Sequence, residues 1–233
     1  MARKKIRGYI DNWFDLNVDE ETRTIYMGSV SKDYDDNETG VDSFMAEFFI
    51  KGMHILNSTS TQPITIIMNN PGGDWYHGMA IFDAIQTSRS HCTIIAHGYA
   101  MSMGSIIMQS ADSRIMMPHS RFMIHYGTDG GGNHAKISEK WADEGKRICH
   151  AMENIYIQRM LEKELEMGKG YLEATINKII DEVSKFQLSR NIKPFKIDSD
   201  DDLRIALQYM LNFDTILTPQ QTIDLGWADE IYE

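Results

Sequence analysis

Short apolar runs alternate with helical patterns in the middle of the chain, and this alternation most restricts the possible fold. The runs lie at 64–68 (ITIIM), 93–97, 114–117 and 122–126. Between the first two, residues 76–88 place apolar side chains on one helical face. Strands that alternate with helices at this spacing form βαβ units with right-handed crossovers. We therefore expect an α/β fold with a mostly parallel sheet covered on both faces.

Helical periodicity also predicts helices outside this region. Residues 41–56 carry a wide apolar face, and residues 135–167 read as one helix about 50 Å long. The apolar stripe of that long helix, which includes Trp141, is too narrow for full burial, and this favours contact with another subunit. Further helices are expected at 172–183, at 201–211 and from Pro219.

Composition excludes several classes of protein. A chain of 233 residues suits one large α/β domain, and a net charge of −11 argues against nucleic-acid binding. Only two cysteines, Cys92 and Cys149, are present, so we expect no disulfide framework and a reducing, cytoplasmic location. The N-terminus lacks the apolar segment of a secretory signal, and no apolar run is long enough to span a membrane.

A serine and a glycine turn are the first candidates for chemistry. Ser102, in GYAMSMGS, stands between an apolar strand and a helix, so it is a candidate nucleophile beside backbone N–H donors. Donors from the glycines of the Pro71-Gly72-Gly73 turn, in NNPGGDW, and from Met103 could converge on one oxygen, as acyl transfer requires. Taken alone, an ordinary tight turn explains the glycine motif better than an oxyanion site does, and a capping role explains Ser102 at least as well as catalysis.

A serine nucleophile needs a base and an orienting carboxylate, and spacing does not select them. Among eight histidines, the candidates near strand ends or turns are His97, His119 and His125. The candidate acids are Asp112, Asp129, Asp181, Asp198, Asp214 and Asp224. The acidic runs KDYDDNETG and DSDDD are most simply solvated loops. A metal site is the lesser alternative, because no ligand-spaced cluster of His, Cys or Glu accompanies them. We expect no metal and no cofactor.

Four motifs taken in order resemble the Clp protease proteolytic subunit family, which consists of ClpP-like serine peptidases. They are MNNPGGDWYHGMAIFDAIQ, GYAMSMGSIIMQSAD, PHSRFMIHYG and FDTILTPQQTIDLGWAD. The likeness covers residues 22–165 and 205–231. It implies a ClpP/crotonase-like α/β fold of repeated ββα and βαβ units, with a protruding handle made of a long helix and a strand.

The resemblance also assigns roles. The nucleophile falls on Ser102, the general base on His125 and the orienting acid on Asp214, with oxyanion donors on the N–H groups of Gly73 and Met103. It implies a serine endopeptidase of unfolded polypeptides, built as heptameric rings that stack to a tetradecamer. ATP would enter only through a separate hexameric AAA+ unfoldase.

The chain departs from the family pattern in two places. Its gap between His125 and Asp214 is long, which places an insertion at 168–200, and the N-terminal arm at 1–22 does not resemble the family's axial loop. We expect a single domain at 23–233, with a head at 23–125 and 205–233 and a handle at 126–167.

Other functions remain open at this point. One is a viral ClpP-like protease for capsid maturation, acting in the host cytoplasm. A second is a catalytically idle ring subunit that regulates active partners. A third is a crotonase-type acyl-CoA enzyme, which would use carboxylates near the oxyanion turn.

Overall fold

The computed structural model describes residues 13–28, 40–127, 135–184 and 193–233. The first twelve residues of the expected arm, most of the KDYDDNETG loop, the 128–134 glycine segment and Asp129 lie outside the described residues. Among the described residues, no helix is both long and apolar enough to cross a membrane.

An eight-stranded mixed sheet forms the centre of the described structure. Its strands are β1 (Val18–Asp19), β2 (Thr24–Gly28), β3 (Ile64–Asn70), β4 (Cys92–Met101), β5 (Ser113–Met116), β6 (Arg121–Ile124), β7 (Thr215–Leu217) and β8 (Glu230–Ile231). The order is β1-β2-β3-β4-β5-β8, and β6 pairs with the far end of β4 and with β7. Among the strands of the described residues, only the β1–β2 and β6–β7 pairs are antiparallel. The α/β prediction with a mostly parallel sheet is therefore confirmed.

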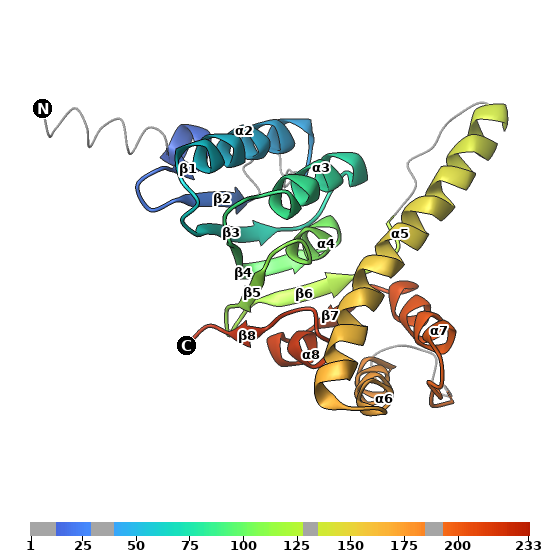
Figure 1. The fold of residues 1–233 in the computed structure, drawn as a ribbon. Helices are drawn as coiled ribbons and strands as arrows, with labels where there is room; N and C mark the ends of the chain where they lie inside the picture. The colour runs from blue at the N-terminus through green and yellow to red at the C-terminus, as the bar shows by residue number, and fades with distance from the viewer. Residues whose placement is uncertain (1–12, 29–39, 128–134, 185–192) are drawn as a thin grey trace, which may run out of the picture.

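The helices, numbered as in Figure 1, also follow the predicted pattern. They are α2 (Ser43–Thr59), α3 (Trp75–Gln86), α4 (Met103–Met108), α5 (Ala135–Met167), α6 (Tyr171–Ser184), α7 (Asp200–Leu211) and α8 (Pro219–Asp224). The long helix has the predicted bounds, 135–167. Its first half projects beyond the sheet, while its second half packs beside α6 and α7 (Figure 1).

Side-chain caps explain where several helices begin. Asp42 and Asp74 each accept a hydrogen bond from a backbone N–H in the first turn of α2 and α3. Ser199 and Asp202 form a capping box at the start of α7. The last three residues of the DSDDD run thus form the first turn of α7 and only its first two precede the helix, which corrects the expectation of a loop for the whole run; acidic residues are favourable at a helix N-terminus.

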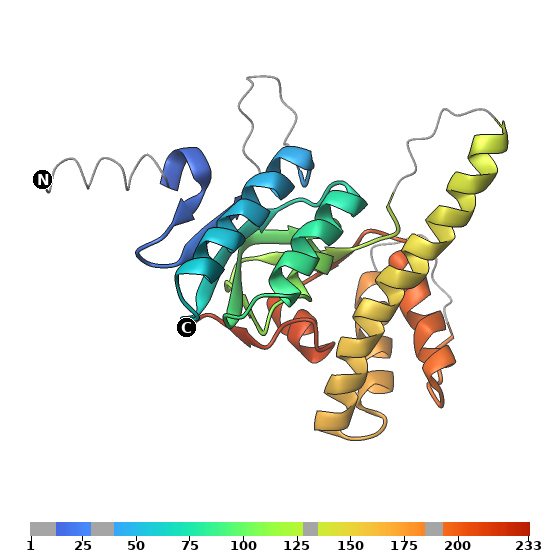
Figure 2. The same cartoon turned by 45° about the horizontal axis from the view of Figure 1, so that its top comes forward.

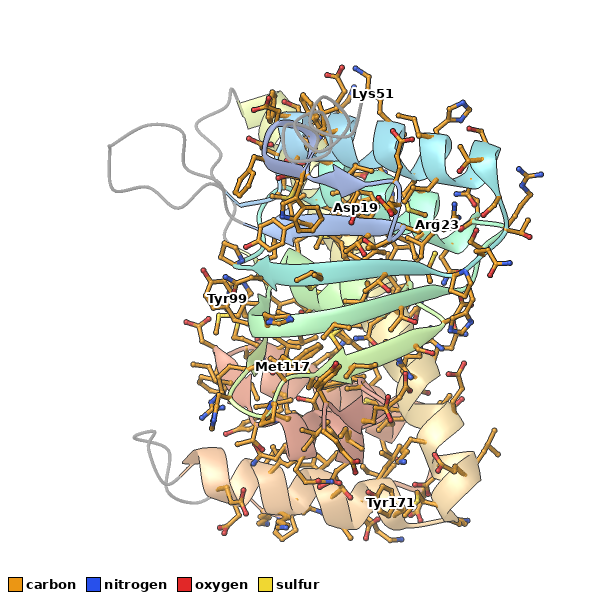
Figure 3. All side chains as sticks on the ribbon, turned by 90° about the vertical axis from the view of Figure 1, so that its left-hand side faces the viewer. Asp19, Arg23, Lys51, Tyr99, Met117 and Tyr171 are labelled. Atoms are coloured by element: carbon orange, nitrogen blue, oxygen red, sulfur yellow. The ribbon has the colours of Figure 1, made fainter. Side chains whose placement is uncertain are left out.

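Helices α2 and α3 lie over the sheet, and the expectation of helices on both faces stays a prediction. Along β3, fully buried side chains alternate with half-buried ones. Figure 2 shows α2 and α3 side by side over the sheet, and Figure 3 views the molecule from the left-hand side of Figure 1, with α2 at the top. Lys51 of α2 and Tyr171 of α6 lie at opposite ends of this view.

Three short strands were not predicted. β1, β7 and β8 contain only two or three residues each, too few to show an alternating pattern. Val18 of β1 is buried against the core, although it falls within the segment expected to be a terminal arm. β7 matters most, because it directly follows Asp214.

Candidate active site

Ser102 occupies a strained backbone position between β4 and α4. Its φ of 50° lies in the left-handed region, which a residue with a Cβ adopts rarely. Neighbouring hydrogen bonds hold it there: its N–H donates to the carbonyl oxygen of Met123 at 2.9 Å, and its own carbonyl oxygen accepts from the Ser105 hydroxyl at 2.5 Å. The Ser102 hydroxyl makes no capping bond to α4. The capping explanation for this serine is therefore wrong.

The hydroxyl of Ser102 lies instead against His125. The distance from Ser102 Oγ to His125 Nε2 is 2.8 Å, and the distance from His125 Nδ1 to Asp214 Oδ1 is 2.9 Å. The imidazole is 23% exposed, whereas the Asp214 side chain is 73% exposed. One histidine thus joins a serine on one side to a carboxylate on the other.

Strand register explains why these three residues meet. β4 and β6 run parallel with Met101 opposite Met123, so the residues just beyond these two strands lie side by side. β6 and β7 run antiparallel with Ile124 opposite Thr215. His125 follows Ile124 and Asp214 precedes Thr215, so these two residues lie beside each other at the end of this strand pair. His125 itself lies one residue beyond β6, which ends at Ile124, and not inside the strand.

The glycine turn after β3 lies directly against Ser102. A Cβ placed on Gly72 would come within 2.5 Å of the Ser102 Cβ and 2.9 Å of the Met103 nitrogen. Gly72 and Gly73 both have positive φ values, 107° and 141°. The turn therefore requires glycine at these two positions, both for conformation and for the close approach.

Two backbone N–H groups are directed away from the local ladder. Val41 forms an isolated parallel bridge with Gly73 by donating to the Gly72 carbonyl oxygen at 2.5 Å and accepting from the Asp74 N–H at 2.8 Å. In such a bridge the N–H of Gly73 takes no part. The N–H of Met103 begins α4, where no carbonyl of the helix can accept it. Both N–H groups are thus available to a ligand oxygen.

Asn70 supports this turn, and sequence reasoning did not single it out. It is fully buried, and its Oδ1 accepts the Gly72 N–H at 2.9 Å. An Asx-type bond of this kind shapes the turn that follows it. The signal was present in the sequence as an asparagine two residues before the glycine.

The structure separates the other candidate residues from Ser102. His97 and His119 are exposed, and no hydrogen bond to Ser102 involves either. Four other candidate acids lie elsewhere: Asp112 accepts the Cys92 N–H, Asp198 pairs with Lys196, Asp224 accepts from Gln220, and Asp181 is exposed on α6. Within the part of the chain that is described, Asp214 alone of the candidate acids contacts His125.

This arrangement supports acyl transfer on chemical grounds. A hydroxyl bonded to an imidazole can lose its proton as it attacks a carbonyl, and a carboxylate behind the imidazole stabilises the resulting cation. Backbone N–H groups beside a nucleophile can hold the oxyanion that forms. Among the described residues, no group of three or more His, Cys, Asp or Glu side chains is placed to hold a metal ion.

Comparison with known proteins agrees with this geometry. Residues 35–173 match the model of the Clp protease family. The "ATP-dependent Clp protease proteolytic subunit" of Deinococcus radiodurans is 34% identical over 121 residues, which cover 51% of this chain and 59% of that protein. The "ATP-dependent Clp protease proteolytic subunit 2" of Pseudomonas aeruginosa is 33% identical over 121 residues, covering 51% and 60%. The proteolytic subunit of Mesostigma viride is 34% identical over 122 residues, covering 51% and 53%.

The matches cover only part of each protein. This chain spans between about half and three fifths of the length of these curated relatives. The segment that matches the family model contains Gly73, Ser102, Met103 and His125, whereas Asp214 lies beyond it. The family model covers more than half of the chain, and the mixed α/β fold agrees with membership of that family. The chain therefore belongs to the Clp protease family.

Proposed function

We propose that the chain is a serine endopeptidase that hydrolyses peptide bonds of unfolded polypeptides inside a ring assembly. The observation that carries the proposal is the continuous hydrogen-bonded order of Ser102, His125 and Asp214. The names of the relatives, which describe proteolytic subunits, support the same activity.

The proposed reaction assigns one role to each group. His125 accepts the hydroxyl proton at Nε2 as Ser102 Oγ attacks the peptide carbonyl, while Asp214 stabilises the protonated imidazole. The N–H groups of Gly73 and Met103 donate to the oxyanion of the tetrahedral intermediate. His125 then gives its proton to the leaving amine. Water then attacks the acyl carbon as it loses a proton to His125, and His125 returns a proton to Ser102 Oγ as the bond between that oxygen and the acyl group breaks.

Replacement of Ser102 tests this proposal, and the chain offers a matched control. Ser113 also lies 3.0 Å from a histidine Nε2, that of His91, but at the amino ends of β4 and β5 and away from the glycine turn. We expect Ser102→Ala to abolish cleavage of a fluorogenic peptide and of casein, and to abolish labelling by a fluorophosphonate. Ser113→Ala should retain both. Cleavage by Ser102→Ala at the wild-type rate would falsify the proposal.

Assembly and partners form the second part of the proposal. Trp141 on the projecting half of α5 is 48% exposed, which supports contact between copies of the chain. The relatives are named as subunits of an ATP-dependent protease, which supports a separate ATPase partner. We propose heptameric rings stacked to a tetradecamer, with a hexameric AAA+ unfoldase feeding substrate. The cytoplasmic location and the absence of a cofactor in this chain stay predictions.

The assembly can be measured on the same sample. Native mass spectrometry of the intact protein should give fourteen copies of the chain, and Trp141→Lys should shift the distribution to smaller species. A monomer that is labelled by a fluorophosphonate at Ser102 would overturn the ring and leave the peptidase proposal intact.

A further inference from the structure

Glu153 of α5 carries a carboxylate inside the protein. The residue is 4% exposed, and α5 is otherwise rich in exposed charges. A buried charge is unfavourable unless hydrogen bonds and opposite charges compensate for lost hydration. Its partners therefore indicate what the carboxylate does.

The partners of Glu153 come from two places that both adjoin the candidate active site. Its Oε1 accepts from the Tyr126 hydroxyl at 2.5 Å and from Gln208 Nε2 at 3.1 Å, and its Oε2 accepts from Arg204 Nη1 at 2.8 Å. Tyr126 directly follows His125. Arg204 and Gln208 lie on α7, which ends three residues before Asp214.

The protonation states are consistent with this network. Burial raises the pKa of the Tyr126 hydroxyl above its usual value, and the bond to the Glu153 carboxylate raises it further. For Glu153, burial alone would raise the pKa, but the bonds from Tyr126, Arg204 and Gln208 outweigh burial and lower it. Tyr126 is therefore the donor and Glu153 the charged acceptor near neutral pH.

Asp214 needs such support because its side chain is open to solvent. It is 73% exposed, and its position depends on the short connection between α7 and β7. The Tyr126 N–H also donates to the carbonyl oxygen of Leu211, the last residue of α7, at 2.8 Å. The end of α7 is thus tied to the chain beside His125 by one backbone bond and by the Glu153 side chain.

We propose that Glu153 is a positioning residue for the reaction: its buried carboxylate joins Tyr126 to Arg204 and Gln208 and so keeps Asp214 in hydrogen-bond reach of His125. This role rests on the proposed peptidase function. Replacement of a buried ion pair by apolar side chains is often neutral or stabilising, so stability alone does not explain a charge at this position. Small displacements of catalytic groups, by contrast, lower rates about 100-fold.

The test uses the full-length protein, a fluorophosphonate and a fluorogenic peptide. Glu153→Gln keeps the shape of the side chain but removes its charge, and Tyr126→Phe removes one hydrogen bond only. We expect Glu153→Gln to lower the labelling rate and kcat at least about tenfold with KM unchanged, and Tyr126→Phe to lower both about threefold. Glu162 lies on the same helix, and its carboxylate accepts a hydrogen bond from Arg159. Glu162→Gln is therefore the control, and its labelling rate and kcat should match those of wild type.

Each rate is divided by the folded fraction of that variant, which urea unfolding measures. Wild-type rates in Glu153→Gln, or a change in KM alone, overturn the role of Glu153. If Glu153→Gln does not fold, Tyr126→Phe decides: a wild-type kcat in that variant overturns the proposal. Absence of Ser102-dependent labelling in the wild-type protein overturns the peptidase function itself. If the wild-type protein is labelled normally and both variants are labelled at the same rate, only the positioning role of Glu153 is overturned.

Discussion

The hydroxyl of Tyr156 lies 2.6 Å from the hydroxyl of Ser105 inside the protein. Ser105 in turn donates to the carbonyl oxygen of Ser102, and Tyr156 is buried on α5. Tyr156 follows Glu153 by three residues, so both side chains lie on one face of that helix. One face of α5 therefore contacts the serine side of the candidate site through Tyr156 and the histidine side through Glu153.

The Tyr156 contact predicts an asymmetry between two single substitutions. Ser105→Ala leaves the Tyr156 hydroxyl buried without a partner and should lower the free energy of unfolding by about 1–3 kcal/mol. Tyr156→Phe leaves Ser105 bonded to Ser102 and should lower it by only about 0.5–1.5 kcal/mol. The double variant should be more stable than Ser105→Ala. Urea unfolding of the three variants measures these free energies. A double variant less stable than Ser105→Ala would contradict the prediction.

A second prediction concerns the glycine turn. Gly72→Ala places a Cβ in contact with Ser102 and Met103 at a φ of 107°, so the turn must move away from Ser102. We expect a loss of about 1–3 kcal/mol from backbone strain and a drop in fluorophosphonate labelling of at least about 100-fold, because the oxyanion donors separate.

Gly145→Ala is the matched control for that substitution. A Cβ on Gly145 meets nothing within 4 Å, and the residue lies inside α5. Alanine there should raise stability by about 0.5–1 kcal/mol with labelling unchanged. Equal labelling of Gly72→Ala and wild type would show that the turn does not contribute to the reaction.

Periodicity predicted the long elements correctly because they contain enough residues to show it. The bounds of α5 and the parallel order of β3, β4 and β5 follow from apolar spacing over many positions. β7 has three residues, TIL, and shows no period, yet its register places Asp214 beside His125. Spacing along the chain therefore could not select this aspartate, and only the family resemblance identified it.

The site residues show the same limit at the level of single side chains. Ser102 and its glycine turn lie in recognisable motifs, whereas the choice of His125 over His97 depends on the pairing of β4 with β6. Glu153 gave no signal, because a glutamate in a charged helix is expected to be exposed. Its burial results from the packing of α7 against α5, which spacing along the sequence does not reveal.

A third prediction follows from the charge state of Glu153. A carboxyl whose pKa is lowered on folding contributes stability above its unfolded pKa, about 4.3, and that contribution is lost as pH falls through the folded pKa. Wild type should therefore lose more stability than Glu153→Gln as pH falls from 7 toward 3. Urea unfolding at each pH measures the two curves. Glu166→Gln, an exposed position on the same helix, should follow the wild-type curve in parallel.

The last prediction separates the two functions that a carboxylate at position 214 could have, stability and catalysis. Asp214 is 73% exposed and bonds His125, and an exposed ion pair contributes about 0–1 kcal/mol to folding. Asp214→Asn should thus unfold at nearly the wild-type urea concentration. Its kcat should nevertheless fall by about 10²–10⁴ with KM unchanged, because an amide neither fixes the imidazole tautomer nor stabilises its cation. Asp224→Asn, which loses only a bond from Gln220, provides the control and should retain activity. A wild-type kcat in Asp214→Asn would remove the carboxylate from the mechanism and leave Ser102 and His125 to act as a pair.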